Sequence, residues 1–345
     1  MDDLVQRDGL TYKKFTDVPF TGEIYGKEAG KFKKGIKEGP WKEYHESGQL
    51  KIKSFYKNGK LDTLWMQYSE DGQLFQKINY KNGKLSGFSE IYFNNQLNSK
   101  THYDDGKMNG LMETYYDSGI LWQKKYYKDG ILNGVFETYF ESGQLKIKAN
   151  IKDDKPEGKT EKFYPNGNLR ATGTFKAFKQ DGVWKYFRED GTLETIQTFK
   201  GGKRDGVYET YNENGDLDYR SYYTGDVLNG AVESYETNGQ FSYKGYYKNN
   251  KKDGLWETIY EDGIKWTENY KDGEKIGIEN MYYKNGKLAS TSNHETGTVQ
   301  GYFESGEIKF SGFIEGNNRE GIWMFFNKDA TLEKTEAYKD DKLIE

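Results

Sequence analysis

The stretch GPWKEYHESGQLKIKSFYKNGKLD, residues 39–62, decides the fold because it recurs with drift along most of the chain. Counted from its first glycine, taken as position zero, the unit begins again about every 24 residues. The thirteen unit starts are Gly39, Thr63, Gly87, Gly110, Gly134, Gly158, Gly182, Gly206, Gly230, Gly254, Gly277, Gly301 and Gly321. The interval that begins at Gly301 is shorter than the others by about four residues. A period of this length sustained over thirteen units indicates a repeat architecture in which each unit contacts its neighbours.

Three apolar columns run through the units. In the first unit they are Tyr44 at position five, Leu50 at position eleven and Tyr56 at position seventeen. The turn-forming dipeptides Ser47-Gly48 and Asn58-Gly59 separate these columns, and such glycines tolerate the positive φ of tight hairpin turns. Each unit is therefore predicted to be a β-hairpin whose glycines mark turns. The even spacing between the leucine and second tyrosine columns predicts that both lie on one face of the sheet.

These hairpins predict an all-β fold, an elongated single-layer antiparallel β-meander built from about 13 stacked hairpin repeats of about 24 residues. A helix is disfavoured because the apolar columns do not follow a helical period. Residues 1–38 are expected to form an N-terminal capping segment, residues 39–300 the hairpin array, and residues 301–345 degenerate repeats that act as a C-terminal cap.

A tryptophan column at position two is the candidate binding row. It comprises Trp41, Trp65, Trp184, Trp256 and Trp323. Position two lies an odd three residues before the tyrosine at position five, so the two columns fall on opposite faces unless a β-bulge intervenes. Two arrangements follow: a sheet that is aromatic on both sides, or a bulge that brings both rows together. If neighbouring repeats cover the tryptophans they are core; if they are exposed in one line they are a surface for an aromatic-stacking ligand.

Composition narrows the possible functions. The 345 residues include 55 acidic and 51 basic side chains, well mixed along the chain, which argues against nucleic acid as a partner. There is no cysteine, and the three histidines, His45, His102 and His294, fall at three different unit positions. These features predict no catalytic residues, no metal site and no cofactor, so the protein is expected not to be an enzyme.

The turns carry opposite charges. The candidate acidic edge, at position seven beside the first turn, comprises Glu46, Glu70, Asp117, Glu141, Glu189, Glu213 and Glu261. The candidate basic edge, at position eighteen beside the second turn, comprises Lys57, Lys81, Lys128, Lys152, Lys176, Lys200, Lys248 and Lys271. Successive turns of a meander lie on opposite edges, so these rows would face apart and steer a lateral partner or a second copy. Ordinary solvated turn residues are the alternative, since Asp62 and Asp181 dilute the basic edge.

The unit resembles the MORN repeats, in particular the bacterial variant written roughly as GxWxxYYxxGxLxxxxxYKDGKxxG. GPWKEYHESGQL with SFYKNGKLDT, and GLMETYYDSGIL with KYYKDGILNG, match that pattern nearly position for position. The resemblance implies a repeat scaffold for protein association, dimerisation or assembly, and it brings the name of the YwqK-type antitoxins. Ser89, Thr160 and Glu279 replace the tryptophan, so a ligand row built on that column would be interrupted.

The leading functional hypothesis is a non-enzymatic protein-protein interaction scaffold or self-association module, with an antitoxin as one subtype. The alternative is ligand binding by the aromatic row, with a carbohydrate, cell-wall component or phospholipid headgroup as ligand. Membrane lipid is the less favoured of the partners because the net charge is negative. No stretch approaches the 18 or so apolar residues of a transmembrane segment. Cytoplasm is the default compartment; the alternative is a secreted or periplasmic protein whose signal peptide was removed before residue 1.

Overall fold

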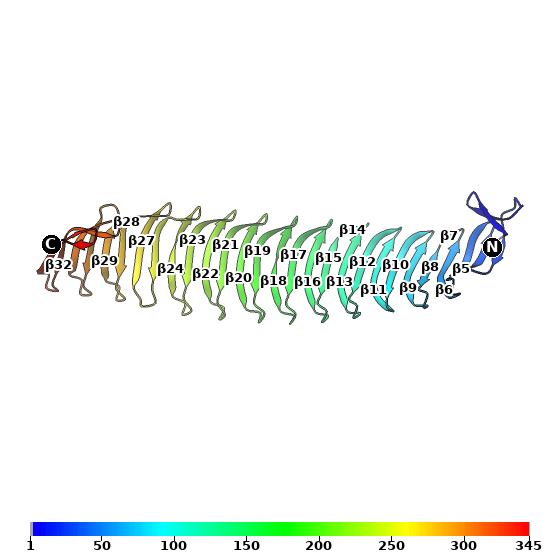
Figure 1. Cartoon of the computed structure of the whole chain (residues 1–345), viewed down its shortest axis with the longest axis horizontal. Helices are drawn as coiled ribbons and strands as arrows, with labels where there is room; N and C mark the ends of the chain where they lie inside the picture. Colours follow the sequence, from blue (N-terminus) through cyan, green and yellow to red (C-terminus); the bar gives the residue numbers. More distant parts are fainter. Residues whose placement is uncertain (1–2, 345) are drawn as a thin grey trace. The chain divides into compact units, whose positions relative to one another are not determined.

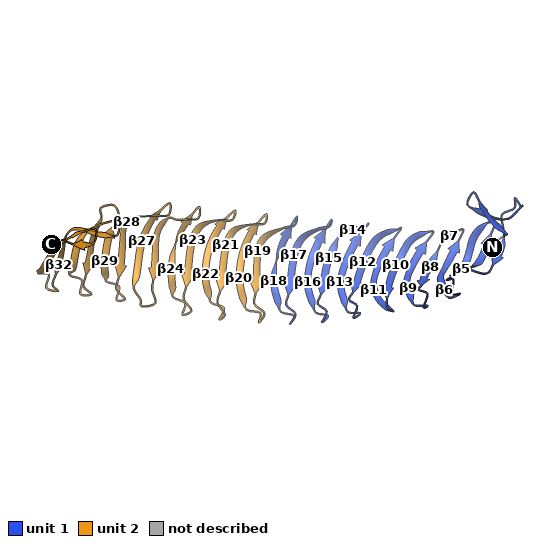
Figure 2. Ribbon diagram, in the orientation of Figure 1, with its two compact units in different colours: residues 1–178 blue, residues 179–345 orange. Residues whose placement is uncertain are grey.

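The computed structural model describes residues 3–344, and every regular element among them is a β-strand. Two compact units divide the chain, Met1–Phe178 and Lys179–Glu345 (Figure 2). In the part of the chain that the structure describes, no helix is long and apolar enough to cross a membrane.

Among its described residues, the first unit contains eighteen strands, β1 to β18. They are β1 (Leu4–Arg7), β2 (Leu10–Lys13), β3 (Gly22–Ile24), β4 (Glu28–Lys33), β5 (Ile36–Tyr44), β6 (Leu50–Lys57), β7 (Lys60–Leu61), β8 (Thr63–Tyr68), β9 (Leu74–Lys81), β10 (Lys84–Phe93), β11 (Gln96–Asp104), β12 (Lys107–Tyr115), β13 (Leu121–Lys128), β14 (Ile131–Leu132), β15 (Gly134–Tyr139), β16 (Leu145–Lys152), β17 (Lys155–Phe163) and β18 (Leu169–Lys176).

The second unit continues the same pattern from β19 to β34. Its strands are β19 (Lys179–Phe187), β20 (Leu193–Lys200), β21 (Lys203–Tyr211), β22 (Leu217–Thr224), β23 (Val227–Tyr235), β24 (Phe241–Lys248), β25 (Lys251–Lys252), β26 (Gly254–Ile259), β27 (Lys265–Lys271), β28 (Glu274–Tyr282), β29 (Leu288–Asn293), β30 (Thr298–Tyr302), β31 (Ile308–Glu315), β32 (Asn318–Phe326), β33 (Leu332–Lys339) and β34 (Lys342–Leu343).

Within each unit, the long strands of the main sheet pair antiparallel with their neighbours in the chain, so each main sheet is a meander of consecutive hairpins (Figure 1). The two-residue strands β7, β14 and β25 pair only with the strand before them. The hairpin of β5 and β6 shows the repeat: its register runs from Gly39 opposite Tyr56 to Tyr44 opposite Leu50. The second turn has two residues, Asn58 and Gly59, both with positive φ, as a type I′ turn requires. The predicted all-β meander of hairpin repeats is confirmed.

A register shift decides which side chains share a face. β5 runs without interruption from Trp41 to Tyr44, so these two side chains point to opposite faces. β6 carries one extra residue where Glu43 pairs with Ile52 but Tyr44 pairs with Leu50. This bulge turns Leu50 to the face of Tyr44.

The sheet is therefore aromatic on both sides, which is the first of the two arrangements considered. Tyr56 shares the face of Trp41, because their rings meet edge-on at 6.0 Å between centroids. The prediction that the leucine column and the position-seventeen tyrosine column share a face is wrong, because the bulge separates them. We call the side of Trp41 and Tyr56 the tryptophan face and the side of Tyr44 and Leu50 the ladder face.

Except at Gly297, the glycine at position zero lies in a strand and not in a turn, which corrects the expectation for this column. In β10 the pairing passes from Leu85 opposite Tyr80 to Ser89 opposite Ile78, so two extra residues bulge out of the strand. Gly87 is one of them and has φ 97°. Positive φ is accessible to glycine at little cost, which explains the recurrence of glycine at this position.

The shortened unit begins at Gly277 and not at Gly301, which corrects the phase of the last repeats. Thr298 pairs with Phe313 and Tyr302 with Ile308, as positions one and five do elsewhere. Position zero is therefore Gly297, with φ 71°, and the four missing residues belong to the second turn of the preceding unit. The expected C-terminal cap from residue 301 thus starts inside a regular unit, and its residue 345 lies outside the described residues.

The expected N-terminal cap divides into two parts. β3 and β4 belong to the main sheet, and Ile24 and Phe32 pack with Trp41 as in a regular repeat. β1 and β2 form a separate two-stranded sheet, from which Leu4 packs against this cluster. Only that small sheet and the segment after it therefore cover the end of the array; residues 1–2 of the expected cap lie outside the described residues.

Candidate functional site

The tryptophan row is core. Trp41, Trp184, Trp256 and Trp323 are 1%, 1%, 3% and 6% exposed, and Trp65 is half-buried. A ligand that stacks on a ring needs an exposed ring face. The candidate binding row is therefore corrected to a structural row, and the aromatic-ligand hypothesis loses its site.

The environment of Trp256 shows how a single sheet buries so large a ring. The rings of Tyr243 and Tyr247 contact it from the preceding repeat, with centroids at 6.2 and 5.1 Å. Gly245 lies beneath the indole, so close that a Cβ built there would lie 2.3 Å from the ring. The ammonium of Lys252 lies 4.1 Å from the centroid and supplies a cation–π contact. Gly30 and Gly312 make the same close approach to Trp41 and Trp323.

The centre of the ladder face carries alternating charges, one side chain on each strand. Position three is mostly glutamate and its cross-strand neighbours at position fourteen are mostly lysine or arginine. In the first compact unit, which ends at Phe178, the run is Lys77, Glu90, Lys100, Glu113, Lys124, Glu137, Lys148 and Glu161. In the second unit it is Glu209, Arg220, Glu233, Lys244 and Glu257.

Several of these neighbours form ion pairs. Arg220 lies 2.8 Å from Glu209 and 3.5 Å from Glu233, so one guanidinium bridges two strands. Glu257 lies 2.8 Å from both Lys244 and Lys265, and hydrogen bonds from these two ammoniums lower its pKa. Opposite charges directly across a strand pair stabilise the sheet and fix its register.

The tyrosine at position five donates its hydroxyl hydrogen bond to the glutamate two residues earlier. Tyr139 bonds to Glu137 at 2.9 Å and Tyr211 to Glu209 at 2.7 Å. Burial, together with the hydrogen bond and charge of the glutamate, raises the pKa of each tyrosine to about 12. The ladder face thus joins its tyrosines to its ion pairs by hydrogen bonds.

In each compact unit, exposed apolar side chains at positions one and sixteen lie beside the ladder, and we call these side chains the apolar row. Its exposed members are Phe55, Phe88, Tyr126, Val183, Tyr222, Tyr246, Leu255, Ile278, Phe313 and Ile322. Leu255 is 53% exposed although it lies within a strand. Contiguous exposed apolar side chains on a folded protein mark interaction surfaces more often than isolated ones do.

Each of the two compact units has a hollow on this surface. In the second unit a hollow of about 400 Å³ is bordered by Ala231, Tyr246 and Leu255, with Glu233 and Lys244 beside them. In the first unit a hollow of about 570 Å³ involves Tyr25, Pro40 and Tyr44. A small residue between larger ones creates the space in the second unit, because Ala231 stands where its neighbours have larger side chains.

The acidic edge is a row of exposed carboxylates, since all seven candidate side chains are exposed. Glu46 pairs with Lys27 at 2.6 Å, and that ammonium lowers the pKa of Glu46. On the same edge, side chains at position six tie successive turns together. The Tyr116 hydroxyl donates to the Tyr139 carbonyl at 2.8 Å, and Nε2 of His45 lies 3.0 Å from the Tyr68 carbonyl.

The basic edge is likewise exposed at all eight candidate lysines. The aspartates that lie among these lysines accept backbone hydrogen bonds. Asp62 accepts a hydrogen bond from the Asn82 backbone N–H at 3.0 Å, and Asp181 accepts one from Gly201 at 3.1 Å. Each carboxylate therefore satisfies a backbone donor in the next turn, and the lysines remain the outward charges.

Sequence reasoning missed the ladder and the apolar row. Both were visible as columns at the 24-residue period, at positions three and fourteen for the charges and one and sixteen for the apolar residues. Their common face could not be read from spacing because the bulge near Leu50 changes the alternation. In the described residues no group of three or more His, Asp or Glu side chains is placed to hold a metal ion.

Comparison with known proteins identifies the repeat. The family model described as "MORN repeat variant" matches eight segments, which together cover just over half of the chain. They are residues 37–58, 61–82, 108–129, 132–153, 156–177, 180–200, 204–224 and 275–296. No curated protein matches the chain.

Among solved structures, a chain of the "Crystal Structure of TcdB2-TccC3-Cdc42" is similar at 10% sequence identity with a TM-score of 0.16. The match covers 87% of this chain but only 19% of the solved chain, and a score this low does not establish a shared fold. The matching family segments carry the hairpin with its position-zero bulge, and MORN repeats are generally protein- or membrane-interaction modules. The chain belongs to the MORN repeat variant family.

Proposed function

We propose that the protein is a non-enzymatic protein-interaction scaffold whose contact surface is the apolar row on the ladder face. The observation that carries this proposal is the exposure of that row within a regular sheet, for example at Leu255 on β26 and at Ile278 on β28. An isolated exposed apolar residue needs no explanation, but a row repeated in most of the hairpins offers extended apolar contact area.

A protein partner suits this surface because apolar and charged groups alternate on it at short range. Leu255 and Tyr246 border the hollow of the second unit, and Glu233, Lys244 and Glu257 surround it. An apolar anchor in a hollow with polar groups at its rim is the usual anatomy of a protein interface. The fixed charges would set the register of the partner, and the apolar anchor would supply most of the affinity.

The two charged edges support a steering role. The acidic edge from Glu46 to Glu261 and the basic edge from Lys57 to Lys271 leave their charges exposed to solvent. Exposed charges act on encounter rates and are screened by salt. Association measured at about 50 and 500 mM salt should therefore slow at the higher concentration; an unchanged association rate would remove the edges from the proposal.

The experiment that tests the scaffold is comparative affinity capture. The intact chain and a double variant, Leu255→Ser with Ile278→Ser, are immobilised, and captured proteins are identified and quantified. A partner of the apolar row should be retained by the wild type and lost by the double variant. Phe15→Ser is the matched control, because Phe15 is fully exposed but lies outside the row. Equal capture by all three proteins would contradict the assigned surface.

The same experiment distinguishes the finer roles. An antitoxin-type protein would retain a toxin, and a dimerisation module would retain a second copy, which sedimentation of the purified chain detects directly. Retention of anionic vesicles in place of protein would favour the membrane role that MORN repeats also serve. Lack of turnover on any captured molecule is expected, since the interaction surface proposed here contains no catalytic group.

A further inference from the structure

The first turn of the unit that begins at Gly87 is shorter than its counterparts. Phe93 pairs with Gln96, so only Asn94 and Asn95 form the turn, both with positive φ. The preceding unit instead has the longer turn closed by Ser69 N–H to the Gln73 carbonyl. The shortened turn leaves open space on both of its sides.

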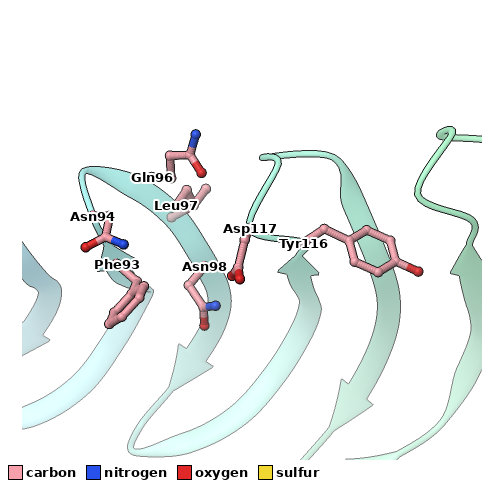
Figure 3. Close-up of a pocket in the computed structure, with 7 residues that line it drawn as sticks. All are labelled: Phe93, Asn94, Gln96, Leu97, Asn98, Tyr116 and Asp117. Atoms are coloured by element: carbon pink, nitrogen blue, oxygen red, sulfur yellow. The ribbon is translucent and has the colours of Figure 1, made fainter.

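We call this space, around Phe93, the notch. On the side of the preceding turn it is a hollow of about 410 Å³, which Phe75, Tyr92 and Asp71 help to line. On the other side it is a smaller hollow of about 80 Å³ bordered by Phe93, Asn98 and Asp117 (Figure 3). Figure 3 shows the Tyr116 ring directed away from the hollow, in keeping with its hydrogen bond to Tyr139.

The notch combines exposed rings with carboxylates. Phe93 is 61% exposed and Phe75 is 45% exposed. Glu70 and Asp71 stand at one side and Asp117 at the other. Among the described residues that line the two hollows there is no lysine or arginine. The surface therefore has apolar and negative character without a neutralising cation of its own.

Other repeats show what lies over the ring at this position. In three repeats, a cation at position twelve lies over the aromatic ring at position six of the same repeat. The pairs are Lys146 over Phe140 at 5.3 Å, Arg170 over Tyr164 at 5.8 Å and Lys309 over Phe303 at 5.9 Å from the ring centroid. Phe93 occupies position six of its unit, and the corresponding position twelve holds Asn98, which is neutral.

From this comparison we propose that the notch binds a cationic side chain, arginine or lysine, of a partner protein, with the cation over the Phe93 ring and near the carboxylates of Asp71 and Asp117. The ring quadrupole attracts a cation within about 6 Å of its centroid, the range in which the three internal pairs lie. The incoming side chain takes the place that the chain's own cation fills in those three repeats. This inference rests on the proposed function in one respect, that the partner is a protein.

Hydrogen bonds favour the charged form of the Asp71 carboxylate. A hydrogen bond from the Ser69 hydroxyl and another from the Gln73 N–H lower the pKa of Asp71, so it is negatively charged. Asp117 is exposed to solvent at the opposite side of the shortened turn. A cation entering the notch therefore meets negative charge from two directions, whereas an anion would be repelled.

The test uses small peptides and the intact chain. The probes are acetyl-Gly-Arg-Gly-amide and acetyl-Gly-Lys-Gly-amide, with the norleucine and glutamate peptides as neutral and anionic counterparts. Proton NMR of the peptide is the readout, because side-chain methylene protons next to a cation held over a ring shift upfield. The expected result is a weak, saturable upfield shift for the cationic peptides alone.

Three variants locate the binding. Phe93→Leu keeps apolar bulk but removes the ring, and should weaken binding about 2- to 5-fold, as the loss of one exposed cation–π contact predicts. Asn98→Lys should abolish the shift, because it supplies the internal cation found in the three other units. Phe140→Leu is the matched control, since that ring is already covered by Lys146, and it should bind the peptides like the wild type.

Contrary outcomes are equally clear. Equal shifts with the norleucine peptide, or binding that survives Asn98→Lys, would overturn the cation site. An effect of Phe140→Leu as large as that of Phe93→Leu would do the same. Because the peptides bypass the natural partner, failure here leaves the apolar row untouched, and loss of capture by the Leu255 and Ile278 double variant leaves the notch untouched.

Discussion

Thr63 has a backbone conformation that does not suit its β-branched side chain. It stands at position zero, where the strand bulges, and its φ is 68°. A β-branched residue is strained in this left-handed region, whereas Gly39 and Gly254 adopt it in the equivalent place at little cost. The neighbouring hairpins impose the bulge even on an unsuitable residue.

Replacing that threonine should stabilise the protein. Thr63→Gly removes the strain of about 1–2 kcal/mol but adds chain entropy to the unfolded state, so the net gain should be about 0.5–1 kcal/mol. Urea unfolding of the variant and the wild type measures this gain in the free energy of unfolding. Gly254→Thr is the reciprocal control, because φ is 78° there and a Cβ would meet nothing within 4 Å. That variant should lose about 1–2 kcal/mol, and a neutral result for both would show that the bulge carries no strain.

Gly245 is needed for a different reason, close approach. A Cβ there would lie 2.3 Å from the ring of Trp256, and the backbone of this glycine is not in the left-handed region. Gly245→Ala should therefore destabilise by about 1–3 kcal/mol through overpacking. Trp256→Val should cost less in the Gly245→Ala variant than in the wild type, since Ser221 and Val232 already form such a pair in the preceding repeat. Additive losses in the double-mutant cycle would refute the steric account.

At the scale of the strand, the charge ladder is the feature that links one hairpin to the next. Arg220 bridges Glu209 and Glu233 while it is itself partly exposed. Arg220→Met keeps the apolar stem but leaves two carboxylates without their shared partner, and should cost about 1–2 kcal/mol in unfolding free energy. Lys84→Met is the comparison, because its partner Asp105 is well exposed, and it should cost less than about 0.5 kcal/mol.

The tyrosine–glutamate pairs along these strands predict an alkaline transition. Burial and the adjacent glutamates raise the pKa of Tyr115, Tyr139, Tyr211 and Tyr270 to about 12. A folded-state pKa above the unfolded value of about 10 means that the contribution is complete below pH 10 and is lost as pH rises towards 12. Ultraviolet titration of tyrosinate should therefore show a late-ionising group of tyrosines, with unfolding free energy falling over the same interval. Titration of all tyrosines near pH 10 in the folded protein would contradict the pairing.

At the scale of the whole molecule, each sheet is a succession of near-equivalent hairpins within its unit. Strands of the first unit pair with their chain neighbours, so stability accumulates from one hairpin to the next. The two 23-residue repeats show that the sheet accommodates the loss of one residue from a repeat. One has the short turn at Asn94 and Asn95, and the other, from Gly254, lacks the bulge, which places Lys265 opposite Ile259.

This organisation predicts which deletions are tolerated. Removing residues 134–157 takes out one complete period and joins Asn133 to Gly158, so the remaining strands keep their faces and edges. The variant should fold, with a urea m-value reduced in proportion to the residues removed. Removing residues 134–145 takes out half a period and places the ladder and tryptophan positions out of phase. If both deletion proteins folded equally well, the repeat would not be the unit of stability.

Much of the fold could be predicted from the chain because hairpin turns are local. Asn58-Gly59 accommodates positive φ at both residues, and the 24-residue period repeats that turn with its flanking strands. The candidate site could be predicted only in part. The residues of the two charged edges could be listed from the turns, and their side chains are exposed, but the sequence left open whether the tryptophan row is core or surface, and the apolar row beside Leu255 was overlooked.

The sequence by itself determined the strands, the turns, the period and the charge of each edge, because these depend on backbone conformations and spacings within one hairpin. The tertiary structure alone decided the faces. The one extra residue near Leu50 reverses the alternation of the side chains beyond it, whereas the two at Gly87 leave it unchanged, and such bulges are defined only by pairing across strands. It likewise decided the burial of Trp256, because the space that the ring fills is made by Gly245 of the preceding repeat.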